Sequence, residues 1–325
     1  VVGGVLALRD AGLERSSIEG MKCAVVTGSS VMDFGGIMNS IEGVQKRGIR
    51  AALPRVLYTI GVGSVASALN SVLGLSARLF SVSTQCNSGI DAIGRAAEMV
   101  ARGEVDLAIC GGSEAPLHRF PLLELRAAGL TPPTTEMPER IARPFDLWRT
   151  TGVVSEGASM FVLEPESSPR PGYAFVDGYA AASDANEEDL CGGMVEAAQL
   201  ALAEARMRTC EVDAINAWGP GHKLVDAGEV RAMREVFGPA LAGIPAVSIK
   251  GAIGTPLGGA PAIQIASAAL ALRHGCIPPT VNWEYPDPAC ALNLSNHFRD
   301  IVHGQTLVNA HGLGGVNACM VLRRC

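Results

Sequence analysis

Apolar residues along this chain fall into two recurring patterns, short continuous runs and longer stretches at helical spacing. The runs at 21–28 (MKCAVVTG) and 105–111 (VDLAICG) are typical of buried strands in a parallel sheet, whose two faces are both covered. Between them, Ile90, Ile93 and Val100 recur at helical spacing and predict a helix. A strand, a crossover helix and a strand of this spacing predict a right-handed parallel unit.

The rest of the chain continues this α/β pattern. The first residues predict an amphipathic helix that ends at Gly12, and 35–55 is a looser stretch that carries four basic residues. The Pro-rich stretch 116–151 is too long for a plain connection and predicts a lid or a substrate-side insertion. Further strands and a helix are expected at 158–164 (strand), 173–182 (strand), 193–206 (helix) and 212–218 (strand).

Two stretches of the chain resemble each other. Both 81–103 and 248–275 begin with a short strand, pass through a turn of small residues and continue into an Ala-rich helix that ends at a basic residue and a glycine. This internal duplication predicts two similar halves that meet at a pseudo-twofold axis. We therefore expect an N-terminal half at 1–166 and a C-terminal half at 167–325.

Composition narrows the function classes. With 325 residues, 48% apolar residues, 38 glycines and 5% aromatic residues, the chain is typical of a tightly packed α/β enzyme. A net charge of -6 argues against nucleic acid as a partner, and no apolar run approaches the roughly 18 residues that membrane insertion needs. The nine cysteines are scattered singly without a CxxC pair, which predicts a reduced, cytoplasmic protein without a metal site.

One cysteine has a distinctive position. Cys86 lies at the corner where the predicted strand of 81–102 turns into the predicted helix, and Asn87, Ser88 and Gly89 make that turn sterically easy. A helix N-terminus favours a thiolate, and a tight turn exposes the sulfur to a carbonyl carbon, as a nucleophile requires. The alternative is a small buried apolar side chain, the commonest role of a free cysteine. Residue chemistry alone favours neither.

The segment STQCNSGIDAIGRAAEMVARGEVDLAICGGSEAP resembles the active-site stretch of the β-ketoacyl-acyl carrier protein synthases (ketosynthases), the condensing enzymes of fatty acid and polyketide synthesis. The resemblance extends over almost the whole chain, through RPFD at 143, SEGA at 155, NAWGPGHKLVDAGE at 216, SIKGAIGTPLGG at 248, PPTVN at 278 and NAHGLGGVNA at 309. It implies a thiolase-like fold with two duplicated α/β halves in five layers. It also implies that the family's first strand, expected to be a central one, is missing at the N-terminus.

The resemblance assigns roles at the site. In the family, the cysteine takes an acyl group from a carrier thioester, and two histidines stabilise the enolate formed when a malonyl unit loses carbon dioxide. Cys86 matches the nucleophile, whereas Trp218 and Thr255 stand where the two histidines are usual. Three other polar residues match family positions and are expected to surround the site rather than form bonds: Lys250, Asp226 and Glu229.

The C-terminal glycine loop completes the expected site. Leu313 replaces the usual gating phenylalanine, and its backbone N–H is expected to form the oxyanion hole with that of Cys86. His311 and His222 are candidates for relocated imidazoles, although either could be a polar loop residue. The resemblance implies no cofactor, an acyl carrier protein as partner, and a homodimer or a heterodimer with a related ketosynthase subunit that pairs through 77–83. The basic stretch 35–55 could dock an acidic carrier.

Three functions follow from these expectations. The first is an acyltransferase of the ketosynthase type that loads an acyl group on Cys86, with condensation impaired or supported by substitute donors. The second is a non-elongating acyltransferase that delivers the acyl group to an alcohol or an amine. The third is a non-catalytic partner subunit similar to a chain length factor, which the cysteine disfavours and the neighbouring Gln85 favours.

Overall fold

The computed structural model describes residues 1–133, 137–186 and 188–325, which form two main β-sheets and one small sheet. The first sheet has the strand order β2-β1-β3-β4, with bounds Cys23–Gly28 (β1), Arg78–Val82 (β2), Leu107–Glu114 (β3) and Gly157–Leu163 (β4). The second has the order β5-β11-β10-β6-β7, with bounds Ala174–Ser183 (β5), Ala214–Asn216 (β6), Ala246–Val247 (β7), Gln305–Gly312 (β10) and Val316–Arg324 (β11). Two short strands form the small sheet: Cys276–Ile277 (β8) and Arg299–Asp300 (β9).

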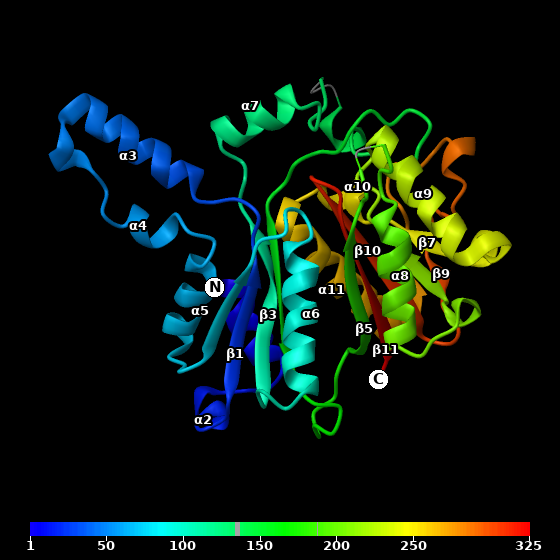
Figure 1. Cartoon of the computed structure of the whole chain (residues 1–325), viewed down its shortest axis with the longest axis horizontal. Helices are drawn as coiled ribbons and strands as arrows, with labels where there is room; N and C mark the ends of the chain where they lie inside the picture. The colour runs from blue at the N-terminus through cyan, green and yellow to red at the C-terminus, as the bar shows by residue number, and fades with distance from the viewer. Residues whose placement is uncertain (134–136, 187) are drawn as a thin grey trace.

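Helices separate and cover the two main sheets in five layers (Figure 1). Two helices lie between the sheets: Ser88–Ala101 (α6) and Ala260–His274 (α11). The outer face of the first sheet is covered by Val2–Asp10 (α1) and Ser64–Leu73 (α5), and that of the second by Gly193–Glu204 (α8) and Lys223–Phe237 (α9). The remaining helices are Arg15–Ile18 (α2), Phe34–Arg47 (α3), Val56–Thr59 (α4), Arg119–Ala127 (α7) and Lys250–Ile253 (α10). The expected five-layer thiolase-like arrangement is confirmed.

The two sheets repeat one strand topology. The orders β2-β1-β3-β4 and β7-β6-β10-β11 match, and in each set the first two pairings are parallel and the last is antiparallel. The second sheet has one further strand, β5, which pairs with β11 at the edge. The first sheet has no counterpart of β5. Because β5 opens the second half but pairs with its last strand, β11, it lies at the edge of its sheet. The expectation of a missing central strand is therefore wrong.

Small residues let the central helices approach the sheets closely. Ten of the 13 residues of α6 from Ser88 to Val100 are buried, and so are most residues of the Ala-rich α11. A Cβ on Gly89 would lie 2.8 Å from the carbonyl oxygen of Gly258, and one on Gly112 would lie 2.8 Å from the Cα of Gly89. Only glycine permits this packing, so the N-terminal end of α6 is held between β3 and the turn that precedes α11.

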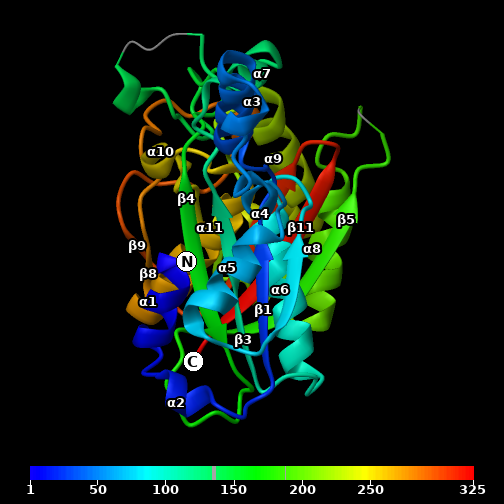
Figure 2. The same ribbon diagram turned by 90° about the vertical axis from the view of Figure 1, so that its left-hand side faces the viewer.

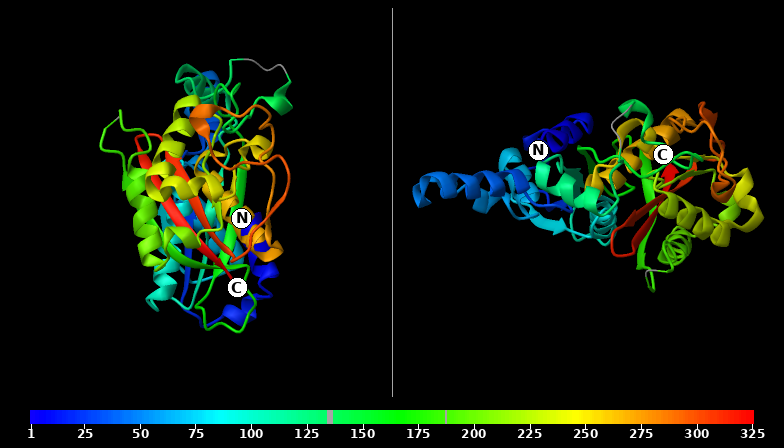
Figure 3. Two further views of the ribbon diagram at one scale, coloured as in Figure 1. Left: turned by 90° about the vertical axis from the view of Figure 1, so that its right-hand side faces the viewer. Right: turned by 90° about the horizontal axis from the view of Figure 1, so that it is seen from above.

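Two segments project from these layers. Residues 35–55, expected to be loosely structured, contain the regular helix α3, which projects with α4 from one side of the molecule (Figures 1 and 3). The excursion at 116–151 contains α7, which lies near α3 above the first sheet (Figure 2). The rings of Phe34 on α3 and Phe120 on α7 lie 5.5 Å apart, and this contact joins the two projections.

Candidate active site

The corner after β2 has the expected nucleophile geometry. The chain leaves β2 at Val82 and enters α6 at Ser88, so Cys86 lies at the N-terminal end of a buried helix. Gln85, directly before it, has a φ of +52°, a left-handed conformation that turns the chain sharply. The Cys86 side chain is half-buried rather than sealed in the core.

The surroundings of Cys86 favour the thiol over the thiolate. Burial, followed by the charge of Glu114, raises its pKa to about 11, while the N–H of Leu313 and the charge of Lys250 lower it. The expectation of a thiolate stabilised by the helix N-terminus is therefore wrong for the free protein, because removing the sulfur from water has the larger effect. The effect of Glu114 could not be predicted from the sequence, since its proximity to Cys86 depends on how β3 packs beside α6.

The C-terminal glycine loop lies against the cysteine. β10 ends at Gly312 and β11 begins at Val316, which leaves the exposed Leu313 in the turn between them. The backbone N–H of Leu313 is close enough to the Cys86 sulfur to lower its pKa. A Cβ on Gly312 would lie 3.0 Å from the backbone nitrogen of Cys86, so glycine is needed for this approach. The structure thus brings together the two backbone groups expected to form an oxyanion hole.

Trp218 follows β6 and is fixed by Glu229. The backbone N–H groups of Trp218 and Gly219 each donate to one oxygen of the buried Glu229 carboxylate, both at 2.8 Å. Asn309 on β10 donates to the same carboxylate at 2.9 Å. The indole is 3% exposed. Hydrogen bonds therefore hold the backbone at Trp218, and the Trp218 side chain packs into the core between the sheets.

Lys250 is a buried basic residue of this region. Its ammonium donates to the Gln264 amide oxygen at 2.7 Å and lies 3.9 Å from the centre of the Trp218 ring, and the side chain is 1% exposed. An ammonium over an indole face is favourable, particularly when both are desolvated. Burial lowers the pKa of Lys250 to about 7, against the charges of Glu229, Asp226 and Cys86, which raise it. Lys250 therefore interacts both with the Trp218 ring and with the charge of Cys86.

Thr255 follows α10, the short helix that begins at Lys250, and has an unused hydroxyl. Its backbone pairs with Val153 through an N–H···O bond of 2.7 Å, and its side chain is 8% exposed. Across the described residues, the Thr255 hydroxyl has no hydrogen-bond partner. A Cβ on Gly152 would lie 3.6 Å from this oxygen. A buried hydroxyl without a partner is unfavourable, so the Thr255 side chain could still make one further hydrogen bond.

The two candidate imidazoles make contacts elsewhere. His311 Nδ1 lies 2.8 Å from the Asn317 side-chain oxygen, and the amide nitrogen of Asn317 donates to Asp184 at 2.7 Å. His222 caps α9 by accepting from the N–H of Val225 at 3.5 Å. Burial, then the charges of Arg149 and His311, lowers the pKa of His222. Within the described ranges, no hydrogen bond joins either ring to Cys86.

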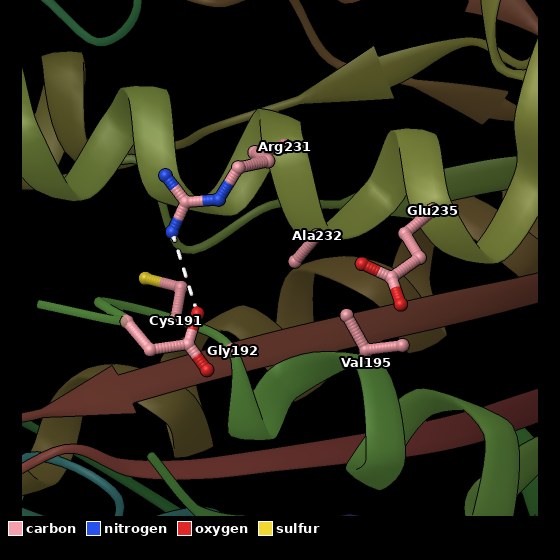
Figure 4. A pocket seen from close by; sticks show the side chains of 7 residues that line it. Cys191, Gly192, Val195, Arg231, Ala232 and Glu235 are labelled. Carbon is pink, nitrogen blue, oxygen red and sulfur yellow. Dashed lines mark ion pairs between the residues drawn. The ribbon is translucent and has the colours of Figure 1, made fainter. Parts of the chain in front are cut away.

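A small cavity lies away from these residues. It has a volume of about 120 Å³, lies between α8 and α9, and is crossed by an ion pair of 3.9 Å between Arg231 and Asp189 (Figure 4). Cys191, also at its wall, is one of nine free thiols. Among the residues that the structure describes, no cluster of three or more His, Cys, Asp or Glu side chains could hold a metal, and no helix is long and apolar enough to cross a membrane.

The layered fold and the cysteine elbow define the class. Two duplicated halves around a buried helix pair, with a cysteine just before the start of one helix, form a thiolase-like molecule. Residues 3–168 match the family model of the beta-ketoacyl synthase N-terminal domain, and residues 173–284 match that of the C-terminal domain. The chain belongs to the beta-ketoacyl synthase family.

Curated relatives agree with this assignment. A "putative polyketide beta-ketoacyl synthase 1" from Streptomyces virginiae is 37% identical over 97% of this chain and 78% of its own length. The tetracenomycin polyketide synthase ketoacyl synthase alpha subunit from Streptomyces glaucescens is 32% identical over 98% and 78%. A 3-oxoacyl-[acyl-carrier-protein] synthase 2 from Rhizobium meliloti is 33% identical over the same shares. The family therefore includes both polyketide and fatty acid enzymes.

Solved structures share the fold. A type II PKS acyl carrier protein in complex with its ketosynthase bound to the hexaketide gives a TM-score of 0.93 at 26% identity, over 99% of this chain and 83% of that chain. The ishigamide ketosynthase/chain length factor gives 0.89 at 29%, over 99% and 80%. A beta-ketoacyl synthase from Burkholderia phymatum gives 0.91 at 27%, over 100% and 81%.

Proposed function

We propose that this chain accepts an acyl group from a carrier thioester on Cys86 and that its decarboxylative condensation is weak. The observation that carries this proposal is the elbow, where a half-buried cysteine at the start of α6 has the N–H of Leu313 beside its sulfur. The two backbone donors, the N–H groups of Cys86 and Leu313, do not depend on which side chains surround them. The histidines expected at 218 and 255 are replaced by Trp218 and Thr255.

The loading step needs only groups that are present. The Cys86 sulfur bonds to the thioester carbon, the bond from that carbon to the carrier sulfur breaks, and the Cys86 proton passes to the departing carrier thiol. Charge develops on the carbonyl oxygen, where each preorganised N–H donor contributes about 3 to 4 kcal/mol. Lys250 lowers the pKa of the Cys86 thiol and so favours the thiolate as it forms.

Condensation needs donors that this site supplies poorly. An enolate forms when a malonyl unit loses carbon dioxide, and each missing donor slows that step by roughly a hundred- to a thousandfold. The Thr255 hydroxyl is free to donate, but neither it nor an indole N–H carries a proton between groups near neutral pH. Transfer of the Cys86 acyl group to an alcohol or an amine is therefore the second candidate.

The carrier is proposed to be an acidic acyl carrier protein. One of the similar structures is a ketosynthase in complex with such a carrier. The projecting segment of α3 and α4 supports docking here, since its basic side chains are exposed: Lys46, Arg47, Arg50 and Arg55. Like charges in one projecting segment steer an acidic partner toward it, an effect that salt weakens.

The exposed edge of β2 supports a second proposed partner, another ketosynthase-type subunit. β2 pairs only with β1, and its first four residues are exposed, with Leu79 at 41% and Phe80 at 38%. An unpaired edge with apolar side chains is a template for a strand of another chain. A similar structure contains a ketosynthase and a chain length factor, so the partner is either a second copy or a related subunit.

The test is mass spectrometry of the protein after incubation with an acyl carrier protein that bears a thioester. Acylation is expected on Cys86 of the unaltered protein and is expected to be absent from the Cys86→Ala variant. The double variant Arg47→Glu with Arg50→Glu is expected to be acylated several-fold more slowly at low salt, because its docking segment has lost positive charge. Arg9→Glu, on a remote helix, is the control. Malonyl carrier is then added and released carbon dioxide is measured. No acylation of Cys86 would leave the non-catalytic subunit as the function, and rapid release would contradict weak condensation.

A further inference from the structure

A chain of hydrogen bonds ties the loop before the nucleophile to the second half of the molecule. Asp91, in the first turn of α6, accepts from the Thr84 hydroxyl on one carboxylate oxygen and from the Tyr179 hydroxyl on the other, the latter at 2.8 Å. Thr84 stands two residues before Cys86, whereas Tyr179 belongs to β5. Three side chains therefore join the elbow, the central helix and the second sheet.

The loop held in this way contains a strained residue. Gln85 has a φ of +52°, a left-handed conformation that is unfavourable for a residue other than glycine. Its carbonyl accepts from the hydroxyl of Ser88 at 2.6 Å and from the Ser88 N–H at 3.2 Å, and the Thr84 carbonyl accepts from the N–H of Asn87 at 3.0 Å. A strained conformation persists only where its surroundings hold it.

The Thr84 backbone is tied into the same turn. Its N–H donates to the Ser88 hydroxyl at 3.0 Å, so its side chain and backbone are both engaged. Any movement of Thr84 is therefore transmitted to Gln85, and from there to the N–H of Cys86. That N–H is one of the two groups that face a developing oxyanion, and its direction is set by the conformation of the preceding residue.

Asp91 and Tyr179 have little freedom to move. Burial raises the pKa of the Asp91 carboxyl, and the hydrogen bonds from Thr84 and Tyr179 lower it. The Tyr179 ring lies against Gly94, where a Cβ would come within 2.4 Å of ring atoms. Burial and then the charge of Asp91 raise the pKa of the Tyr179 hydroxyl, which therefore stays protonated as a donor.

We propose that Asp91 and Tyr179 are positioning residues for Cys86. They hold Thr84 so that Gln85 keeps its left-handed conformation and the Cys86 N–H points to the acyl oxygen. This inference rests on the proposed acyl transfer to Cys86 and adds to it a link between the second sheet and the nucleophile. Neither side chain touches the reacting atoms.

The experiment compares two reactions of Cys86 in four variants: Asp91→Asn, Tyr179→Phe, Thr84→Val and the conservative Thr84→Ser. Acylation by a small acyl thioester uses the backbone N–H groups, whereas alkylation by iodoacetamide needs only the sulfur. In the first three variants acylation is expected to fall about 10- to 100-fold, while alkylation stays within about threefold. Thr84→Ser keeps the hydroxyl and is expected to retain both rates.

Two outcomes would overturn the proposal. Equal loss of both rates together with a lower melting temperature would show that the bonds only stabilise the fold, and unchanged acylation in folded variants would show that they do not position the elbow. If the unaltered protein is not acylated, the proposed function fails separately. Amide hydrogen exchange at 84–88 then decides this inference. In the variants, exchange at 84–88 is expected to become faster while exchange in α11 does not change. Exchange that changes equally in both segments would contradict the inference.

Discussion

Cys86 illustrates how two residue-scale effects compete. A helix N-terminus stabilises a charge by about 0.3 to 1 kcal/mol, which is less than one pKa unit. Burial and the Glu114 charge outweigh it and raise the pKa from the usual 9.0 to about 11. The lone cysteine could be located from the sequence. Its protonation state could not, since that depends on groups from distant segments.

The first prediction concerns the pH dependence of Cys86 alkylation. With a pKa of about 11, only about 0.1% of Cys86 is thiolate at pH 8, so its rate with iodoacetamide should rise about tenfold per pH unit up to pH 10. Peptide mass spectrometry follows Cys86 and the exposed Cys210 in one sample. Cys210 serves as the internal reference and should react faster at pH 8. A Cys86 rate that levels off above pH 7 would contradict the raised pKa.

The second prediction concerns the replaced imidazoles. Trp218→His combined with Thr255→His restores two donors at the positions where the family resemblance expects them, so decarboxylation of a malonyl carrier should rise at least tenfold. Carbon dioxide release is measured on the double variant, on both single variants and on the unaltered protein. Unchanged circular dichroism confirms folding. A folded double variant without any gain would show that other features of the site limit condensation.

At the scale of elements, close backbone packing fixes the nucleophile helix. The strand and helix around Cys86 follow from apolar spacing, and the structure confirms both. The helix α3 was not predicted although Ile37, Ile41 and Val44 lie at helical spacing, because the glycines and basic residues of this stretch favoured a looser structure. Spacing also could not show that Gly89 meets the backbone of Gly258, a contact between segments that are distant in the sequence.

The third prediction tests that contact. Gly89→Ala places a Cβ 2.8 Å from the carbonyl oxygen of Gly258, where the backbone cannot yield easily, and overpacking of this kind costs about 1 to 3 kcal/mol. The melting temperature and the rate of Cys86 acylation should both fall. Gly35→Ala in α3 is the matched control, because its Cβ would meet only ordinary contacts at 3.6 Å. Equal melting temperatures for the two variants would contradict the close packing.

At the scale of the whole molecule, the first sheet has a free edge at β2 that the sequence only suggested. The stretch 77–83 is apolar enough to lie in an interface, but its position at the outer edge of the four-stranded sheet emerged from the strand order. The same order corrected the expectation of a missing central strand, since β5 lies at the edge of its sheet.

The fourth prediction concerns assembly through this edge. Leu79→Lys combined with Phe80→Lys adds charges that oppose strand pairing between subunits, so the molar mass from light scattering at micromolar concentration should fall to that of one chain. Leu224→Lys on α9 is the control, because Leu224 is 67% exposed on the opposite outer layer. An unchanged mass in the edge variant would show that β2 is not the interface.

The sequence by itself determined the main strands and helices of the core, the duplication seen in 81–103 and 248–275, the family and the corner that carries Cys86, because these depend on local spacing and on residue identity. Tertiary structure alone decided that Lys250 lies over the Trp218 ring, that Glu114 acts on Cys86, and that burial raises the pKa of the Cys86 thiol. The physical reason is that burial and electrostatic coupling arise only when distant segments pack together, and neither leaves a pattern along the chain.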